Sequence, residues 1–182
     1  ELVAHDHSCV TFCGENPETL QYLKLCMQTD YYHISLSTDV LGIESAVALK
    51  NGYALGIALS IGANRKAFGD ETLHYNSQAG LFGQGVKEMR ELLKMIAGSD
   101  AALPVGAGDL YVTVYGGRTR LVGILLGEGL SIDEALDKLK GVTLESLVIA
   151  RRVNAALLRR YSSATIAEKF PLLAHVSGLI SG

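Results

Sequence analysis

The segment Gly42-Ile43-Glu44-Ser45-Ala46-Val47-Ala48-Leu49-Lys50-Asn51 decides the fold of this 182-residue chain. It is rich in helix-forming apolar residues, and the apolar repeat continues along one side towards Gly62. Thr38 or Asp39 can cap the start of this helix with a side-chain oxygen. From Ser37 to the C-terminus the apolar residues recur at helical spacing, and the β-prone runs disappear. The sequence therefore predicts a long helix that ends near Gly62 and opens a helical domain over residues 38–182.

One charged side chain, Lys50, lies in the middle of this apolar stretch. Removing an ammonium group from water is costly unless the charge is paired or neutralised. The plain interpretation is a lysine near a helix boundary that extends its side chain into solvent. The apolar residues that follow, 52–57, leave little water within reach. We therefore expect Lys50 to take part in acid–base chemistry.

A second informative segment is Gly106-Ala107-Gly108-Asp109-Leu110-Tyr111-Val112-Thr113, followed by Arg118-Thr119-Arg120. Residues 98–108 are expected to form a loop, which places Asp109 at a helix N-cap. Arginine binds phosphate through paired hydrogen bonds, and Gly116-Gly117 lets backbone and guanidinium approach an anion together. The plain alternatives are a simple helix cap and a solvated turn. Together with Lys50, these residues predict acid–base chemistry on a small phosphorylated molecule.

Residues 1–37 have a different pattern, in which two β-prone runs, Cys9–Cys13 and Tyr31–Leu36, flank a helical segment. The helix is expected to begin at Asn16-Pro17, because proline is favoured in the first turn. Strand, helix and strand in this order indicate an α/β unit too small to fold alone. The sequence contains no Gly-x-Gly-x-x-Gly, the phosphate-binding fingerprint of a dinucleotide-binding domain.

The rest of the chain is expected to be helical after a polar connection from Gly62 to Leu73. Further helices are predicted at residues 76–96, 120–126, 131–139, 143–160 and 171–179. The third of these begins with Ser131-Ile132-Asp133-Glu134, which has capping-box spacing. The predicted fold class is therefore mainly α, with an all-helical domain preceded by a small α/β remnant.

The composition excludes several kinds of protein. A formal charge of -3 argues against nucleic-acid binding, because too few Lys and Arg can gather on one face. Three cysteines favour a reducing compartment over a disulfide framework. The N-terminus lacks a signal-peptide pattern, and the longest uncharged run, Asn51–Asn64, is too short to span a bilayer. We expect a soluble, cytoplasmic protein with no membrane span and no nucleic-acid partner.

The segment His5-Asp6-His7-Ser8-Cys9 alternates side chains that can bind a metal ion. No second pair of ligands follows at the spacing of a zinc site, so we expect no metal. Cys13 has no convincing histidine partner, which makes a cysteine nucleophile an unfavoured interpretation.

Five motifs occur in one order along the chain and carry a family resemblance. They are Gly42-x-Glu44-x-x-x-Ala48-Leu49-Lys50-Asn51, Gly85-x-x-Glu88-Met89, Gly106-x-Gly108-Asp109-Leu110-x-Val112-Thr113, Arg118-x-Arg120-x-x-Gly123 and Leu126-Gly127-Glu128-Gly129. In this order the chain resembles the C-terminal, substrate-binding half of NAD(P)-dependent glycerol-3-phosphate dehydrogenases. The resemblance covers roughly residues 1–160. It implies an all-helical domain like that of 6-phosphogluconate dehydrogenase, with residues 1–37 as the end of a Rossmann domain.

The resemblance also implies an activity, the interconversion of sn-glycerol 3-phosphate and dihydroxyacetone phosphate in glycerol-3-phosphate metabolism and phospholipid biosynthesis. Lys50 would be the catalytic acid/base, and Arg118 would hold the phosphate and reach towards the cofactor. The remaining implied substrate contacts are Asn51, Asp109, Thr113 and Thr119. NAD or NADP would be bound mainly by an N-terminal domain absent from this sequence, so the chain alone is expected to be inactive.

Two departures from the family pattern affect the substrate and cofactor contacts. Gly117-Arg118-Thr119 stands where the family usually has Ser-Arg-Asn, and Lys140-Gly141-Val142 stands where Glu-Gly-Val is expected. Lys140 is a candidate cofactor contact, and a base there would favour NADP. The alternatives are a related hydroxyacid or ketopantoate-type reductase and a non-catalytic helical dimerisation domain. A homodimer is compatible with each of these interpretations.

Overall fold

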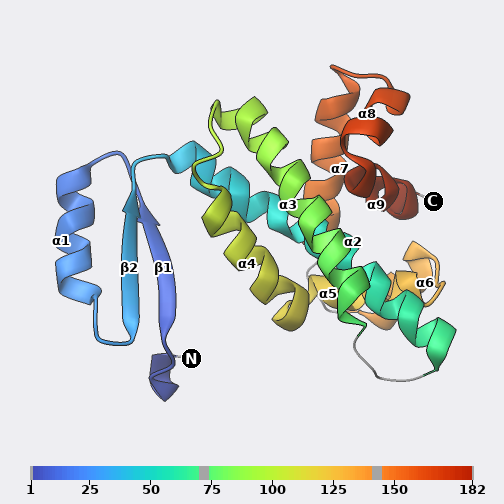
Figure 1. The fold of residues 1–182 in the computed structure, drawn as a ribbon, viewed down its shortest axis with the longest axis horizontal. Helices are drawn as coiled ribbons and strands as arrows, with labels where there is room; N and C mark the ends of the chain where they lie inside the picture. Colours follow the sequence, from blue (N-terminus) through green and yellow to red (C-terminus); the bar gives the residue numbers. More distant parts are fainter. Residues whose placement is uncertain (1, 70–73, 141–144, 182) are drawn as a thin grey trace.

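The structure is a computed structural model that describes residues 2–69, 74–140 and 145–181. A small α/β unit precedes a larger group of helices, and the two lie side by side (Figure 1). The first unit comprises a 3₁₀ turn at Leu2–Ala4, β1 (Ser8–Cys13), α1 (Pro17–Met27) and β2 (Tyr32–Ser37). The helices that follow are α2 (Val40–Phe68), α3 (Tyr75–Ala97), α4 (Leu103–Gly116), α5 (Thr119–Gly127), α6 (Ile132–Lys138), α7 (Glu145–Leu158), α8 (Ser163–Lys169) and α9 (Pro171–Ser181). The predicted fold class, mainly α with a small α/β unit first, is confirmed.

The strand–helix–strand prediction for the N-terminal residues is confirmed. β1 and β2 pair in parallel from Ser8 opposite Tyr32 to Cys13 opposite Ser37. A parallel pair needs a crossover, and α1 provides it. The side chain of Asn16 accepts hydrogen bonds from the first free N–H groups of α1, so the helix begins where the sequence predicts.

Helix α2 begins as predicted, with the carboxylate of Asp39 accepting from the N–H of Gly42 at 2.8 Å. It ends at Phe68 rather than near Gly62, so the polar connection predicted from Gly62 is wrong over its first part. Gly62 does not stop the helix, because its missing side chain lets α5 approach. A Cβ there would lie 2.0 Å from the carbonyl oxygen of Ile124. The helix stops instead at Gly69, which has a positive φ of 68°.

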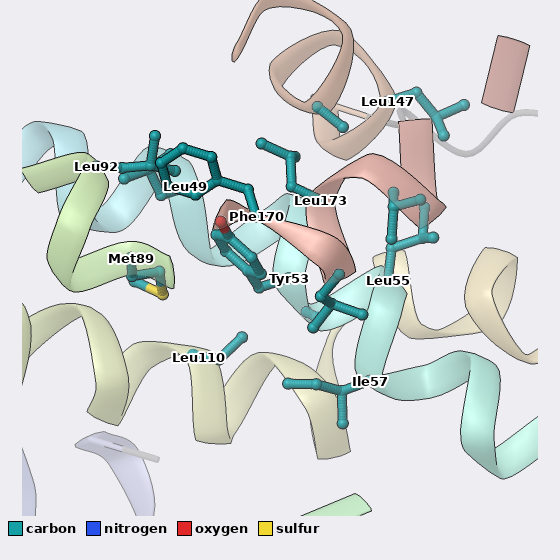
Figure 2. Close-up of a cluster of buried hydrophobic side chains, with 14 of the residues drawn as sticks. Leu49, Tyr53, Leu55, Ile57, Met89, Leu92, Leu110, Leu147, Phe170 and Leu173 are labelled. Carbon is teal, nitrogen blue, oxygen red and sulfur yellow. The ribbon is translucent and has the colours of Figure 1, made fainter. Parts of the chain in front are cut away.

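α2 is the central helix of the fold and contacts α3, α4, α5, α7 and α9. It is buried without interruption over residues 52–58. Around it, Figure 2 shows the cluster in which Leu49 and Tyr53 of α2 meet Met89 of α3 and Phe170. By length and composition α2 as a whole is long and apolar enough to cross a membrane, although the uncharged run Asn51–Asn64 within it is too short. However, 67% of its most apolar window is buried inside the protein, as in a core helix.

The start of α4 differs from the predicted loop over residues 98–108. Gly98 does end α3, with a φ of 72°, but a new helix begins at Leu103. Pro104 lies in its first turn, where proline is tolerated. The glycines that indicated a loop lie inside the helix. Asp109 is therefore in the middle of α4, and its predicted N-cap role is wrong.

The C-terminal helices complete the core on the side of α2 away from the strands (Figure 1). The predicted capping box of α6 is confirmed, since Ser131 and Glu134 bond to each other's backbone N–H. The sequence did not predict α8, whose N-cap is Ser162. The first residues of the helix predicted at 143–160 lie outside the described residues.

Candidate active site

Lys50 and Asp109 form an ion pair where α2 crosses α4. Their side chains are 17% and 32% exposed, so the ammonium group is largely shielded and the carboxylate less so. The prediction that Lys50 has a charged partner in the second segment is confirmed. The pair satisfies the charge of a lysine that would otherwise be unpaired in an apolar environment.

The two residues meet because small residues let their helices approach closely. A Cβ at Gly106 would lie 2.9 Å from the Cβ of Ala46, so only glycine allows this approach without a shift. Asp109 follows Gly106 by three positions and Lys50 follows Ala46 by four. On each helix this spacing is about one turn, which places both side chains on the same side of the crossing.

A cavity of about 780 Å³ lies beside Asp109, between the α/β unit and the helices, and Lys50 is reached from it through Asp109 rather than lining it. Asp109 and Gly108 of α4 line one side of it, and Val47 of α2 lies next to them. Thr11 of β1 and Ser35 of β2 line the opposite side. A small polar molecule in this cavity would therefore be in reach of the Asp109 carboxylate.

Thr113 lies one turn beyond Asp109 on α4. Its hydroxyl donates to the carbonyl oxygen of Asp109 at 2.7 Å, and its own carbonyl accepts from the N–H of Gly117 at 2.9 Å. A Cβ at Gly117 would lie 2.6 Å from that carbonyl oxygen. A side chain at Gly117 would therefore require this turn to shift.

Arg118 and Thr119 follow this turn and differ in exposure. Arg118 is exposed, and within the described part of the chain its side chain has no hydrogen bond or ion pair. Thr119 begins α5 and is 9% exposed. Arg118 is therefore free to bind an anion, whereas Thr119 is largely enclosed.

Arg120 does not lie in the solvated turn that was the plain alternative. Its Nη1 donates to the carbonyl oxygen of Tyr115 at 2.9 Å. Its Nε is buried and has no hydrogen-bond partner among the described residues. No sequence signal identified this contact, because it depends on how α5 turns back against the end of α4.

Asn51 and Lys140 are not brought to the Asp109 cavity. Asn51 lines a separate cavity of about 480 Å³ between α2 and α7, together with Glu44 and Arg152. Lys140 follows α6, is 79% exposed and pairs with Asp137 at 3.3 Å. Sequence analysis did not single out Arg152, whose place beside Asn51 depends on the packing of α7.

Of the N-terminal segment, His7 pairs with His33 of β2, whereas His5 stacks on Tyr31. The Nδ1 of His7 lies 3.0 Å from the Nε2 of His33, across the two strands. Over residues 2–69, 74–140 and 145–181, no three His, Cys, Asp or Glu side chains are placed to hold a metal ion.

The family model described as the C-terminus of NAD-dependent glycerol-3-phosphate dehydrogenase matches residues 39–182. The chain belongs to this family. The matched region includes both α2, which carries Lys50, and α4, which carries Asp109.

Curated relatives are longer than this chain. It is 33% identical over 142 residues to the NADP(+)-dependent glycerol-3-phosphate dehydrogenase of Archaeoglobus fulgidus, covering 77% of this chain and 42% of the relative. It is 28% identical over 184 residues to the chloroplastic glycerol-3-phosphate dehydrogenase [NAD(+)] 2 of Arabidopsis thaliana, covering 99% of this chain and 40% of the relative. The chain thus spans less than half the length of these glycerol-3-phosphate dehydrogenases.

Solved structures show the same fold. DsGPDH of Dunaliella salina has a TM-score of 0.79 at 25% identity, covering 100% of this chain and 34% of that one. Glycerol-3-phosphate dehydrogenase from Coxiella burnetii has a TM-score of 0.77 at 24% identity, covering 98% of this chain and 52% of that one. The likeness therefore includes the strands and α1 as well as the helices.

Proposed function

We propose that this chain is the substrate-binding part of an NAD(P)-dependent enzyme that interconverts sn-glycerol 3-phosphate and dihydroxyacetone phosphate. Lys50 is the proton-transfer residue in this proposal. The observation that carries it is the ion pair of Lys50 with Asp109, whose side chain lines a cavity large enough for a small phosphorylated molecule. The names of the longer glycerol-3-phosphate dehydrogenase relatives support the choice of substrate over a hydroxyacid or ketopantoate.

The proposed reaction needs a base for one proton. Oxidation of the C2 alcohol removes a hydride from carbon and a proton from oxygen, and the neutral amine of Lys50 accepts that proton. In the reverse direction the Lys50 ammonium returns it to the C2 oxygen. Asp109 holds the Nζ atom in place in both directions, because the two side chains are paired. Bound NAD(P) supplies the hydride acceptor at the nicotinamide C4.

Arg118 is the proposed phosphate contact. It is exposed and lacks a partner among the described residues, so binding an anion would break no existing interaction. A guanidinium group suits a phosphate because it donates two parallel hydrogen bonds. Thr113, Thr119 and Asn51 remain proposed substrate contacts. Of these, Thr113 lies one turn beyond Asp109 on the same helix.

The residues present fit only part of a dinucleotide cofactor. Exposed Arg118 can donate to it, but the two strands carry no glycine-rich phosphate loop. We therefore propose that residues 1–37 are the end of a dinucleotide-binding domain, and that residues 38–182 form the substrate domain. The pairing of Lys140 with Asp137 adds no support for its predicted cofactor contact. The preference between NAD and NADP then depends mainly on the other domain.

The test is an activity assay of the whole protein that contains this chain and its dinucleotide-binding half. Dihydroxyacetone phosphate with NADH or NADPH should be reduced, and ketopantoate should not. Oxidation of either nicotinamide with ketopantoate alone would favour the alternative reductase. Calorimetry on residues 1–182 should show no tight NADH binding. Low-micromolar binding would contradict the proposal that the cofactor is bound mainly by the dinucleotide-binding domain.

Two further properties are part of the proposal. A cytoplasmic location fits the cysteine content, although the Arabidopsis relative is named as chloroplastic. A homodimer fits the exposed apolar side chains of α4, among them Tyr111 and Tyr115, which are 60% and 37% exposed. Sedimentation of the whole protein would test it, and a monomer at micromolar concentration would contradict it.

A further inference from the structure

Arg120 joins two helices across the turn that carries the proposed phosphate contact. Tyr115 lies in the last turn of α4, and Arg120 lies in the first turn of α5. The hydrogen bond from Nη1 of Arg120 to the carbonyl oxygen of Tyr115 therefore spans Gly116-Gly117 and Arg118. We propose that Arg120 is a positioning residue that fixes the direction of Arg118. The inference rests on the proposed phosphate contact of Arg118.

The bond caps the C-terminal end of α4. The last carbonyl groups of a helix have no donor within the helix, and a cation there also interacts favourably with the helix dipole. Arg120 provides both the donor and the charge at Tyr115. Its Nε is buried, so the side chain lies against the protein at this atom while Nη1 reaches the Tyr115 carbonyl near the surface.

The turn is fixed from its other side as well. The N–H of Gly117 bonds to the carbonyl oxygen of Thr113, and no side chain fits at Gly117. Thr119, on the far side of Arg118, is largely buried. Arg118 is thus an exposed side chain on a backbone held before and after it. Loss of the Arg120 bond would release one of these two attachments.

This attachment also sets the position of Arg118 relative to the proton-transfer residue. Asp109 and Thr113 lie on the same helix as Tyr115, and Asp109 holds Lys50. A small substrate must reach Arg118 with its phosphate and Lys50 with its C2 oxygen at the same time. Because such alignment determines reactivity, the end of α4 needs a fixed geometry.

The experiment titrates the whole protein, with its dinucleotide-binding half, with glycerol 3-phosphate and with inorganic phosphate, and measures binding by calorimetry. Arg118→Ala should weaken glycerol 3-phosphate binding at least tenfold, because the charge-assisted contact to the phosphate is lost, and Arg120→Ala should weaken it by about tenfold but no more than Arg118→Ala does. Arg120→Lys should retain most of the affinity, because an ammonium group can donate to the Tyr115 carbonyl. Arg90→Ala, which removes an exposed arginine paired with Glu91, is the control for net charge.

Combining the substitutions separates positioning from direct binding. If Arg120 acts through Arg118, then adding Arg120→Ala to Arg118→Ala should cause no further loss. Additive losses, or wild-type binding by Arg120→Ala, would overturn the inference. If Arg120→Ala does not fold, a tenfold loss in Arg120→Lys would also overturn it. If Arg118→Ala binds glycerol 3-phosphate as tightly as the wild type, the proposed phosphate contact itself is overturned. The same holds if the wild type shows no binding at all.

Discussion

The buried carboxylate of Glu88 accepts a hydrogen bond from the backbone N–H of Leu172, 84 residues later in the chain, at 2.8 Å. Its second oxygen accepts from the N–H of Leu173 at 3.1 Å. These N–H groups belong to the first turn of α9, where a helix has no acceptors of its own. Phe170, which precedes the helix, has no side-chain oxygen to cap it. Glu88 of α3 therefore serves as the cap of α9.

Replacing Glu88 should destabilise the protein strongly. Glu88→Ala leaves the buried N–H groups of Leu172 and Leu173 without an acceptor, and each such donor costs about 1–3 kcal/mol. We expect the free energy of unfolding to fall by about 3 kcal/mol, measured by urea denaturation. Glu91→Ala, on the exposed side of α3, is the control. Equal stability of the two variants would show that Glu88 does not hold α9.

Tyr53 lies beside Glu88 and should make stability depend on pH in alkali. Burial, followed by the negative charge of Glu88, raises the pKa of Tyr53 well above its ordinary value of 10.0. The unfolded chain therefore loses this proton at lower pH than the folded protein. The contribution of Tyr53 to the free energy of unfolding is therefore fully present below pH 10. It is lost as the pH rises through the pKa that Tyr53 has in the folded protein.

The measurement is urea denaturation between pH 8 and pH 11. Tyr53→Phe should lose less stability over this range than the wild type, because the ionisable group is gone. Tyr22→Phe, at a 67% exposed position, should follow the wild type. A parallel decline in Tyr53→Phe would contradict the assignment.

Two glycine substitutions should have opposite effects on stability. A methyl group at Gly62 would meet the backbone of α5, so Gly62→Ala should lower the free energy of unfolding by about 1–3 kcal/mol. Gly80 of α3 has open space at the same position, and Gly80→Ala should stabilise by about 0.5–1 kcal/mol. Thermal melts of both variants provide the test. Stabilisation by Gly62→Ala would show that α2 and α5 are not in close contact there.

The sequence predicted more of the fold than of its contacts. The start of α2 could be predicted because Asp39 is a local cap. The end of α2 could not, because Gly62 is used for contact with α5 rather than for a turn. Gly106 misled the prediction in the same way. It indicated a loop, but it lies inside α4, where it allows close contact with Ala46. A glycine in a sequence does not distinguish a turn from a close helix approach.

The candidate site shows the same limit. Lys50 could be singled out because a charge in an apolar stretch needs a partner, and Asp109 is that partner. Glu88 appeared in a motif, but its role depends on a helix far along the chain. Arg120 likewise acquires its contact only through the turn between α4 and α5. Local patterns identified the charged residues, whereas their partners depend on how the helices pack.

The most direct test of the account is the turnover of Lys50→Met in the whole protein with its dinucleotide-binding half. Methionine keeps the length and apolar character of the side chain, so folding should survive. Turnover of dihydroxyacetone phosphate should fall by about 10²–10⁴, the contribution of a positioned acid or base, with little change in cofactor affinity. Lys94→Met, at an exposed ion pair, should retain wild-type turnover. Near-normal turnover by Lys50→Met, with activity abolished in Asp109→Ala, would show that Lys50 is structural.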